Sequence, residues 1–406
     1  MTEKISKWIK AIDRDSDGFT KMEGVLNKPV EDLSERFCAA PFDYVDIQSG
    51  GRLFLCCPTW LPTEIGNLSD MELIDGFNSE TAQRIRASIL EGSFKYCHKL
   101  ACPYIQGGSL PKRTEIQDER HKRIVEQAQV SGLEPNHISL CYDDSCNLSC
   151  PSCRTNFISL KSGPEYDERR SLQKKVIRFA FGAPHDRALV ITITGSGDPL
   201  GSKLFRDLLF SIDGSRYPNV RIDLHTNGVA FTAAAWGKLE RIHKNIRKVI
   251  VSVDAGNEEQ YRITRRGGNW GMLMKNLEML GRKRQEATLR SLELNLIVQR
   301  DNFRGIPDYV RIGQRVGADC CSLSLLSDWG TWSKEELQAR TVWSSDHPLF
   351  EEFLRVMADP ILEAPIVYLG NTFAYRKEAL AQLRASGQDQ IKGQQESAQT
   401  RADQTL

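Results

Sequence analysis

The 406-residue sequence lacks the long apolar runs and the charge bias that mark membrane proteins and nucleic-acid-binding proteins. No stretch approaches the roughly 18 apolar residues that a membrane-spanning helix needs. The 54 Lys and Arg residues nearly balance the 53 Asp and Glu residues, so no net field favours a polyanionic partner. The first residues also lack the apolar core of a signal peptide. We therefore expect a cytoplasmic protein that binds neither membranes nor nucleic acid.

The sequence also has no internal repeat, no Ser-His-Asp constellation and no Walker-type phosphate loop. It does contain 11 cysteines, most of which lie close to another cysteine in the sequence. An odd number of closely spaced cysteines indicates thiolates that hold metal, and a disulfide framework is the weaker interpretation.

Short β-rich runs alternate with amphipathic stretches from about residue 137 onwards. The runs predict strands over 137–142, 187–194, 220–226, 246–255, 292–299 and 319–326. The stretches predict helices over 166–182, 202–212, 231–244, 269–284 and 304–316. Such repeats form parallel sheets with right-handed crossovers, and six units are too few to close a TIM barrel. We expect an α/β fold with a partial (βα)6 barrel, whose chemistry lies in the loops after the strands.

The composition divides the chain into four parts. Residues 31–136 hold five cysteines and the hairpin-like stretch "YVDIQSGGRLFLCC", whose turn is Gly50-Gly51. We interpret them as a separate, small, cysteine-rich domain before the barrel, which we assign to 137–375. Residues 1–30 form a lead segment. Residues 376–406, rich in Gln, Ser and charge, predict a disordered tail.

The densest set of cysteines follows the first barrel strand, in "CYDDSCNLSCPSC". Cys146, Cys150 and Cys153 lie on the loop after that strand. Three thiolates can hold a cubane [4Fe–4S] cluster and leave one iron open, whereas a structural zinc site needs four ligands. Cys141 could supply a fourth ligand, but it falls inside the strand, and we interpret it as a buried strand residue.

This triad at the end of a first strand resembles the cluster loop of the radical SAM superfamily. The resemblance implies a [4Fe–4S] cluster, S-adenosyl-L-methionine (SAM) and SAM contacts after the later strands. These contacts are Ser196, Gly197, Asp198 and Pro199 in "SGDP", Thr226 and Asn227 after the third strand, Ser252 and Asp254 near the ribose, and Arg266 at the SAM carboxylate. In this resemblance Asp198 accepts from the methionine ammonium, and Arg265 is the alternative to Arg266.

The cysteines before the barrel resemble those of the auxiliary iron–sulfur domains called twitch or SPASM. The resemblance implies a second [4Fe–4S] cluster, with the ligands Cys38, Cys56, Cys97 and Cys102. Cys57 could replace Cys56, and a zinc ribbon is the alternative to a cluster. A fully ligated cluster cannot easily bind substrate, so the implied role is electron transfer.

The resemblance implies an enzyme that cleaves SAM reductively to a 5′-deoxyadenosyl radical, which abstracts hydrogen from a substrate. We expect a two-electron oxidation of a small molecule such as a sugar or cyclitol, with the auxiliary cluster as electron acceptor and flavodoxin or ferredoxin as external electron donor. Modification of a peptide side chain is the alternative, and radical epimerisation and rearrangement remain open. A non-enzymatic zinc-binding module is the third hypothesis. The sequence identifies no general base or hydrogen-atom donor.

Overall fold

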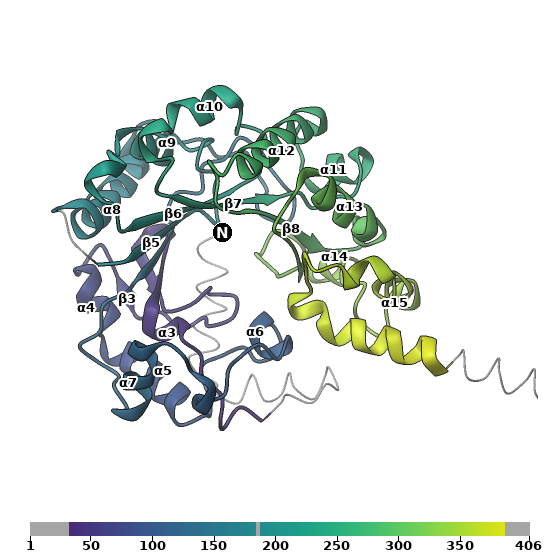
Figure 1. The fold of residues 1–406 in the computed structure, drawn as a ribbon, viewed down its shortest axis with the longest axis horizontal. Coiled ribbons are helices and arrows are strands. Elements are labelled where there is room, and N and C mark those ends of the chain that lie inside the picture. Colours follow the sequence, from purple (N-terminus) through teal and green to yellow (C-terminus); the bar gives the residue numbers. More distant parts are fainter. Residues whose placement is uncertain (1–31, 184–186, 386–406) are drawn as a thin grey trace, which may run out of the picture.

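The computed structural model describes residues 32–183 and 187–385. Its strands form one sheet that curves into a partial barrel, with helices on the outer side (Figure 1). The strand order is β10-β9-β8-β7-β6-β5-β4-β1-β2-β3. The strands are β1 (Tyr44–Gln48), β2 (Arg52–Phe54), β3 (Gly66–Asn67), β4 (His137–Cys141), β5 (Leu189–Ile193), β6 (Val220–Thr226), β7 (Ile246–Ser252), β8 (Leu292–Val298), β9 (Cys320–Leu325) and β10 (Val367–Tyr368).

Helices follow the barrel strands, and five of them lie in the predicted amphipathic stretches. They are α8 (Pro164–Phe181), α9 (Lys203–Ser211), α10 (Ala233–Lys238), α11 (Glu258–Thr264), α12 (Trp270–Gln285), α13 (Ile306–Val316), α14 (Lys334–Gln338) and α15 (Phe350–Met357). The N-terminal segment adds α3 (Ala40–Asp43), α4 (Leu73–Phe77), α5 (Glu80–Leu90), α6 (Pro103–Gln106) and α7 (Glu119–Glu126). Strands β4 to β9 coincide with the six predicted runs and pair in parallel, so the predicted (βα)6 barrel is confirmed. No helix in the described residues is long and apolar enough to cross a bilayer.

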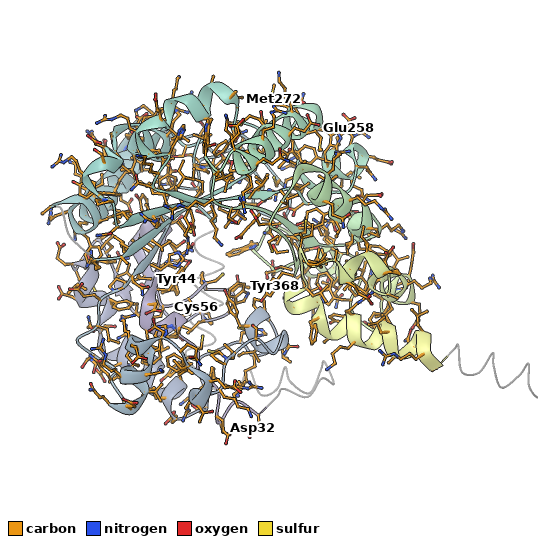
Figure 2. The ribbon with its side chains drawn as sticks, in the orientation of Figure 1. Asp32, Tyr44, Cys56, Glu258, Met272 and Tyr368 are labelled. Carbon is orange, nitrogen blue, oxygen red and sulfur yellow. The ribbon has the colours of Figure 1, made fainter. Side chains whose placement is uncertain are left out.

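Residues alternate between the two faces of the barrel strands. In β8 the even-numbered residues from Leu292 to Val298 are fully buried beneath helices, whereas Glu293 and Asn295 keep some exposure on the inner face. Strands β5 and β9 alternate in the same way. The apolar core therefore lies between sheet and helices, and the inner face is more polar and partly accessible. Tyr44, Cys56 and Tyr368 are labelled within the arc of the sheet in Figure 2.

The cysteine-bearing N-terminal segment shares this sheet. Strand β1 pairs in parallel with β4, with Tyr44 opposite His137 and Gln48 opposite Cys141. Strands β1 and β2 form the predicted hairpin through a 3-10 turn whose Gly50 has a φ of 72°, a conformation that favours glycine. One apolar core runs through the segment and the barrel.

The end of the described chain returns to the N-terminal segment. A 3-10 turn, η7 (Gly370–Thr372), follows β10, and the side chain of Asn371 donates to the carbonyl of Ala101 at 3.3 Å. The helix over 373–385 then buries Arg376 and Ala379. The fold thus continues past 376, the predicted start of the tail, because this helix packs an apolar face onto the core. Residues 386–406 and the lead segment lie outside the described residues.

Candidate active site

Three cysteines converge on the loop after β4. Cys146 and Cys150 are buried, Cys153 is partly exposed, and all three pack together with Leu148. The backbone N–H of Cys153 donates to the carbonyl of Cys150 at 3.0 Å, which closes a tight turn between these two residues. The loop thus gathers three thiols at the carboxyl end of a parallel strand, the position where such barrels carry their chemistry.

Each of the three thiols meets a nitrogen donor. Arg154 Nη2 lies 3.1 Å from Cys153 Sγ, and Arg265 Nη1 lies 3.7 Å from Cys150 Sγ. The third donor is an amide on the loop after β6, since Asn227 Nδ2 lies 3.6 Å from Cys146 Sγ. Burial raises the pKa of the Cys146 thiol to about 12 and also raises that of Cys150. Iron would deprotonate the thiols, and these donors would then stabilise the thiolate charge.

The "SGDP" loop after β5 presses against the cysteine loop. A Cβ at Gly197 would lie 2.5 Å from the carbonyl oxygen of Asp143 and 2.6 Å from that of Ser145. The backbone N–H of Asp198 also donates to the Ser145 carbonyl, at 3.0 Å. Only glycine permits this approach, so the two loops are held together at the triad.

Asp198 itself is fully buried, and every hydrogen-bond acceptor position of its carboxylate is filled. Oδ2 accepts from Thr226 Oγ1 at 2.7 Å and from the backbone N–H of Asn227 at 2.9 Å. Oδ1 accepts from the backbone N–H groups of Leu200 at 3.0 Å and Gly201 at 2.8 Å. A carboxylate offers about four acceptor positions, and all are used. The geometry favours a positioning role over the predicted contact with the methionine ammonium.

Arg265 and Arg266 point to different surroundings. Arg265 Nη2 pairs with Asp254 Oδ2 at 2.8 Å, and the side chain is only 13% exposed. Arg266 is exposed, and its Nε donates to Ser149 Oγ at 3.2 Å. Burial raises the pKa of Asp254 even though Arg265 opposes the shift. The geometry favours Arg265 over Arg266 as the arginine that reaches the reactive end of the barrel.

Two groups of residues at this site went unrecognised in the sequence. His225 lies beside Ser252, with Nε2 and Oγ 2.9 Å apart, and burial lowers its pKa to about 4, so it is neutral near pH 7. Behind the cysteine loop, buried Arg169 pairs with Asp143 at 2.7 Å and also with Asp144. In the sequence, the two adjacent acidic residues just before the triad, Asp143 and Asp144, could have indicated that a buried cation pairs with them.

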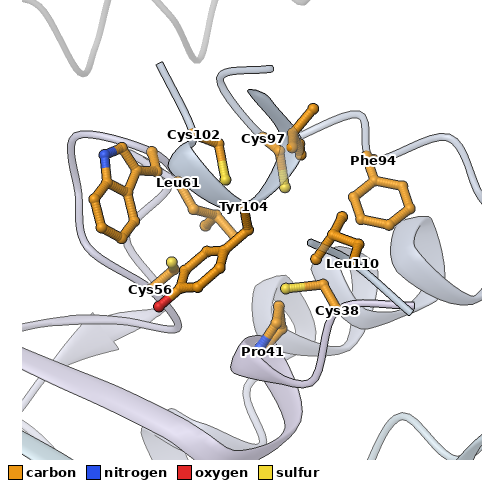
Figure 3. Close-up of a pocket in the computed structure, with 11 residues that line it drawn as sticks. Cys38, Pro41, Cys56, Leu61, Phe94, Cys97, Cys102, Tyr104 and Leu110 are labelled. Atoms are coloured by element: carbon orange, nitrogen blue, oxygen red, sulfur yellow. The ribbon is translucent and has the colours of Figure 1, made fainter. Parts of the chain in front are cut away.

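A second group of thiols lines an apolar pocket near the start of β1 and after β2. Cys38, Cys56, Cys97 and Cys102 surround it together with Trp60, Leu61, Phe94 and Tyr104 (Figure 3). Cys57 is not among the lining residues; it hydrogen-bonds to Thr59. The structure therefore favours Cys56 over Cys57 as a ligand.

The four thiols of this pocket are buried. Burial raises the pKa of Cys38 to about 12 and those of Cys56 and Cys97 well above the usual value, so the metal-free thiols are neutral. Four cysteine thiols are the ligand set of a cubane cluster and also of a structural zinc site.

Two family models match these two sites. The model of the radical SAM superfamily matches residues 144–292, and that of the SPASM iron–sulfur cluster-binding domain matches residues 38–103. Within the barrel, residues 144–292 are a radical SAM domain. This radical SAM domain binds a [4Fe–4S] cluster and SAM, and the SPASM segment before it binds an auxiliary iron–sulfur cluster, as the sequence predicts.

Several solved structures are similar at low identity. SuiB from Streptococcus suis is 15% identical, with 76% of this chain and 64% of that chain covered and a TM-score of 0.36. TYW1 with a lysine-pyruvate adduct bound is 17% identical, with coverages of 54% and 70% and a TM-score of 0.33. The radical SAM methyltransferase TsrM from Kitasatospora setae is 15% identical, with coverages of 45% and 32% and a TM-score of 0.31. No curated protein matches the sequence.

Proposed function

We propose that this radical SAM enzyme oxidises a small polar molecule, such as a sugar or cyclitol, by two electrons. When bound, the cluster with SAM supplies a 5′-deoxyadenosyl radical that removes a hydrogen atom, and the auxiliary cluster supplies a one-electron acceptor. Cys146, Cys150 and Cys153 would hold the first cluster. Cys38, Cys56, Cys97 and Cys102 would hold the second.

The auxiliary pocket is the observation that carries this proposal. Four thiols line it, which is the full ligand set of a cubane and leaves no iron open to a substrate. The other lining residues are mostly apolar, and Trp60 and Tyr104 meet edge to face, with ring centroids 5.9 Å apart. A closed site of this kind suits electron transfer better than substrate binding.

The inner face of the barrel supports a polar, uncharged substrate. Four of its charged groups form ion pairs: Lys248 Nζ lies 2.6 Å from Glu293, and Arg247 Nε lies 2.9 Å from Asp223. Hydroxyl and amide groups such as Ser322 and Asn295 lie beside them, with Ser322 Oγ 3.0 Å from Asn295 Oδ1. Hydroxyl groups of a polyol can exchange hydrogen bonds with such a surface without breaking an ion pair.

We also propose flavodoxin or ferredoxin as the electron donor. Cys153 is the partly exposed member of the triad, so the first cluster would lie nearest to solvent on this side. Exposed Arg266 lies there too, with Nη2 3.4 Å from the carbonyl of Thr155. A cation beside the cysteine loop suits an acidic donor protein.

The proposal is tested by anaerobic reconstitution of the wild type and of the triple variant Cys146→Ala/Cys150→Ala/Cys153→Ala. Iron and sulfide analysis with Mössbauer spectra should give about eight irons in the wild type and about four in the variant, one cubane fewer. With dithionite and SAM, only the wild type should form 5′-deoxyadenosine. With a substrate from the sugar or cyclitol class, it should release a product oxidised by two electrons. Zinc in both sites without deoxyadenosine would contradict the proposal.

A further inference from the structure

A carboxyl group lies on the inner face of β1, where the mechanism so far assigns no residue. Asp46 is 3% exposed and accepts hydrogen bonds from the neutral side chains of Tyr44, Gln48 and Cys141. Tyr44 Oη donates to Oδ2 at 3.1 Å, and Gln48 Nε2 donates to Oδ1 at 2.9 Å. Tyr44 and Gln48, which flank Asp46 on the same face of β1, both keep some exposure, whereas Asp46 is buried.

Asp46 differs from the other acidic groups of the barrel. Asp223, Glu293 and Asp254 are each paired with a cation, and Asp198 has every acceptor position filled. No Lys, Arg or His among the described residues forms an ion pair with Asp46, and its three neutral donors leave an acceptor position free. It therefore has room to receive a proton.

The surroundings of Asp46 also suit a proton acceptor near neutral pH. Burial raises its pKa to about 7, and the hydrogen bonds from Tyr44, Gln48 and Cys141 only partly oppose this. The titratable groups that face it are Tyr44 on its own strand, Cys141 on β4 and Cys57 after β2. Burial raises the pKa of each of these three groups above its usual value, so all are neutral at pH 7. A base of this kind is effective when its pKa lies near the working pH.

Asp46 lies between the two cysteine sites. On one side, its neighbour Cys141 accepts from the backbone N–H of Gly195 at 3.3 Å, and the Cys141 carbonyl accepts from Ser196 Oγ at 2.7 Å. Ser196 begins the "SGDP" loop. On the other side, Cys57 directly follows Cys56, which lines the auxiliary pocket. Figure 2 labels Tyr44 and Cys56 in this part of the molecule.

We propose that Tyr44 and Asp46 together accept the proton that an alcohol substrate releases during its oxidation; this rests on the proposed function. Once the carbinol carbon has lost a hydrogen atom, the hydroxyl proton passes to Tyr44 Oη while the Tyr44 proton passes to the Asp46 carboxylate. The remaining electron would go to the one-electron acceptor that the iron–sulfur cluster of the auxiliary site would supply when bound. The C–O bond becomes a carbonyl, and the substrate has lost two electrons and two protons in all.

The first test needs no substrate. Difference infrared spectra of the reconstituted full chain, recorded across about pH 5–9, should show a protonated-carboxyl band that disappears near neutral pH. The band should be absent from Asp46→Asn and retained in Asp207→Asn, which replaces an exposed carboxylate on α9. A wild-type spectrum identical to that of Asp46→Asn throughout this range would overturn the proposal.

The second test separates hydrogen abstraction from proton loss. myo-Inositol and glucose, deuterated on carbon, serve as probes in anaerobic assays with SAM and dithionite. We expect Asp46→Asn and Tyr44→Phe to transfer deuterium to 5′-deoxyadenosine within about threefold of the wild type, yet to form about 100-fold less ketone, the usual size of general-base catalysis. Asp46→Glu should restore part of the ketone formation.

The outcomes distinguish the two proposals. If the wild type transfers deuterium but releases no ketone, or transfers none, the proposed oxidation fails whatever Asp46 does. If the wild type forms ketone and both variants form it equally well, the proposed role of Tyr44 and Asp46 is overturned and the oxidation stands. Should Asp46→Asn fail to fold, the wild-type pH profile decides: ketone formation should fall below about pH 7 while deuterium transfer does not, and parallel profiles would overturn the role.

Discussion

Replacing the saturated carboxylate of Asp198 by an amide should destabilise the protein whether or not SAM is present. In Asp198→Asn, the remaining carbonyl can still accept from Leu200 and Gly201. The new NH2 group would then face the backbone N–H of Asn227, 2.9 Å from Oδ2 in the wild type, and the Thr226 hydroxyl. The Thr226 hydroxyl can rotate and accept a hydrogen bond from the new NH2 group, but the buried N–H of Asn227 can only donate. The buried N–H of Asn227 would lack an acceptor, and the hydrogen bonds to a charged carboxylate would be lost. Together these effects should lower the free energy of unfolding by about 2–4 kcal/mol.

Urea denaturation of the metal-free protein measures this loss, and SAM binding to the reconstituted protein is measured alongside. The matched control is Asp207→Asn, which removes a half-exposed carboxylate paired with Lys203 at 2.5 Å and should cost no more than about 1 kcal/mol. Suppose instead that Asp198→Asn is as stable as the control yet no longer binds SAM. The carboxylate would then contact the methionine ammonium, as the sequence predicts, and its interpretation as a positioning residue would be wrong.

Three further predictions concern the loops and the inner face. Cys56→Ser should lose about four of roughly eight irons while Cys57→Ser retains them, as iron analysis after reconstitution can check; equal loss would place both thiols at the cluster. Gly197→Ala must move backbone that lies 2.5 Å from the new Cβ, so SAM affinity should fall about 10- to 100-fold by calorimetry, whereas Gly237→Ala, with open space around it, should not change it. Because the pKa of Asp46 is raised from 3.8 to about 7, its protonated form stabilises the fold below about pH 4, and this contribution is lost as the pH rises through 7. Denaturation across that window should show the loss in the wild type and not in Asp46→Asn.

The barrel could be predicted from local sequence because each of its units encodes its own pattern. Strand β8, for example, begins with the alternation Leu-Glu-Leu-Asn-Leu, and α13 after it ends before Gly317, whose φ of 70° terminates the helix. Parallel strands then need only the right-handed crossover rule to be ordered. The cysteine triad was recognisable for the same reason, since its three members fall within eight residues of one another along the chain.

Features that depend on distant pairing could not be predicted in this way. The pairing of β1 with β4 joins residues 93 positions apart, Tyr44 with His137, and no local pattern encodes it. Without that pairing, Asp46 is merely a polar residue in a short hairpin strand. With it, Asp46 lies opposite Ser139 and beside Cys141, on the face that looks into the barrel. The N-terminal position of the auxiliary segment thus has a structural consequence, because it adds a strand with an acidic residue to the barrel wall.

The choice between Arg265 and Arg266 shows a second limit of sequence reasoning. The two residues are adjacent after the last turn of α11, and both precede Gly267, so composition and spacing treat them alike. Their side chains diverge because the helix does not continue through them: Arg265, the C-cap of α11, has a φ of −121° and a ψ of 58°. Burial of Asp254 decides which one turns inward, since an uncompensated carboxylate there would be costly and Arg265 is placed to pair with it. The ion pair between Arg265 and Asp254 thus joins the end of α11 to the loop after β7, and it can be recognised only in the folded chain.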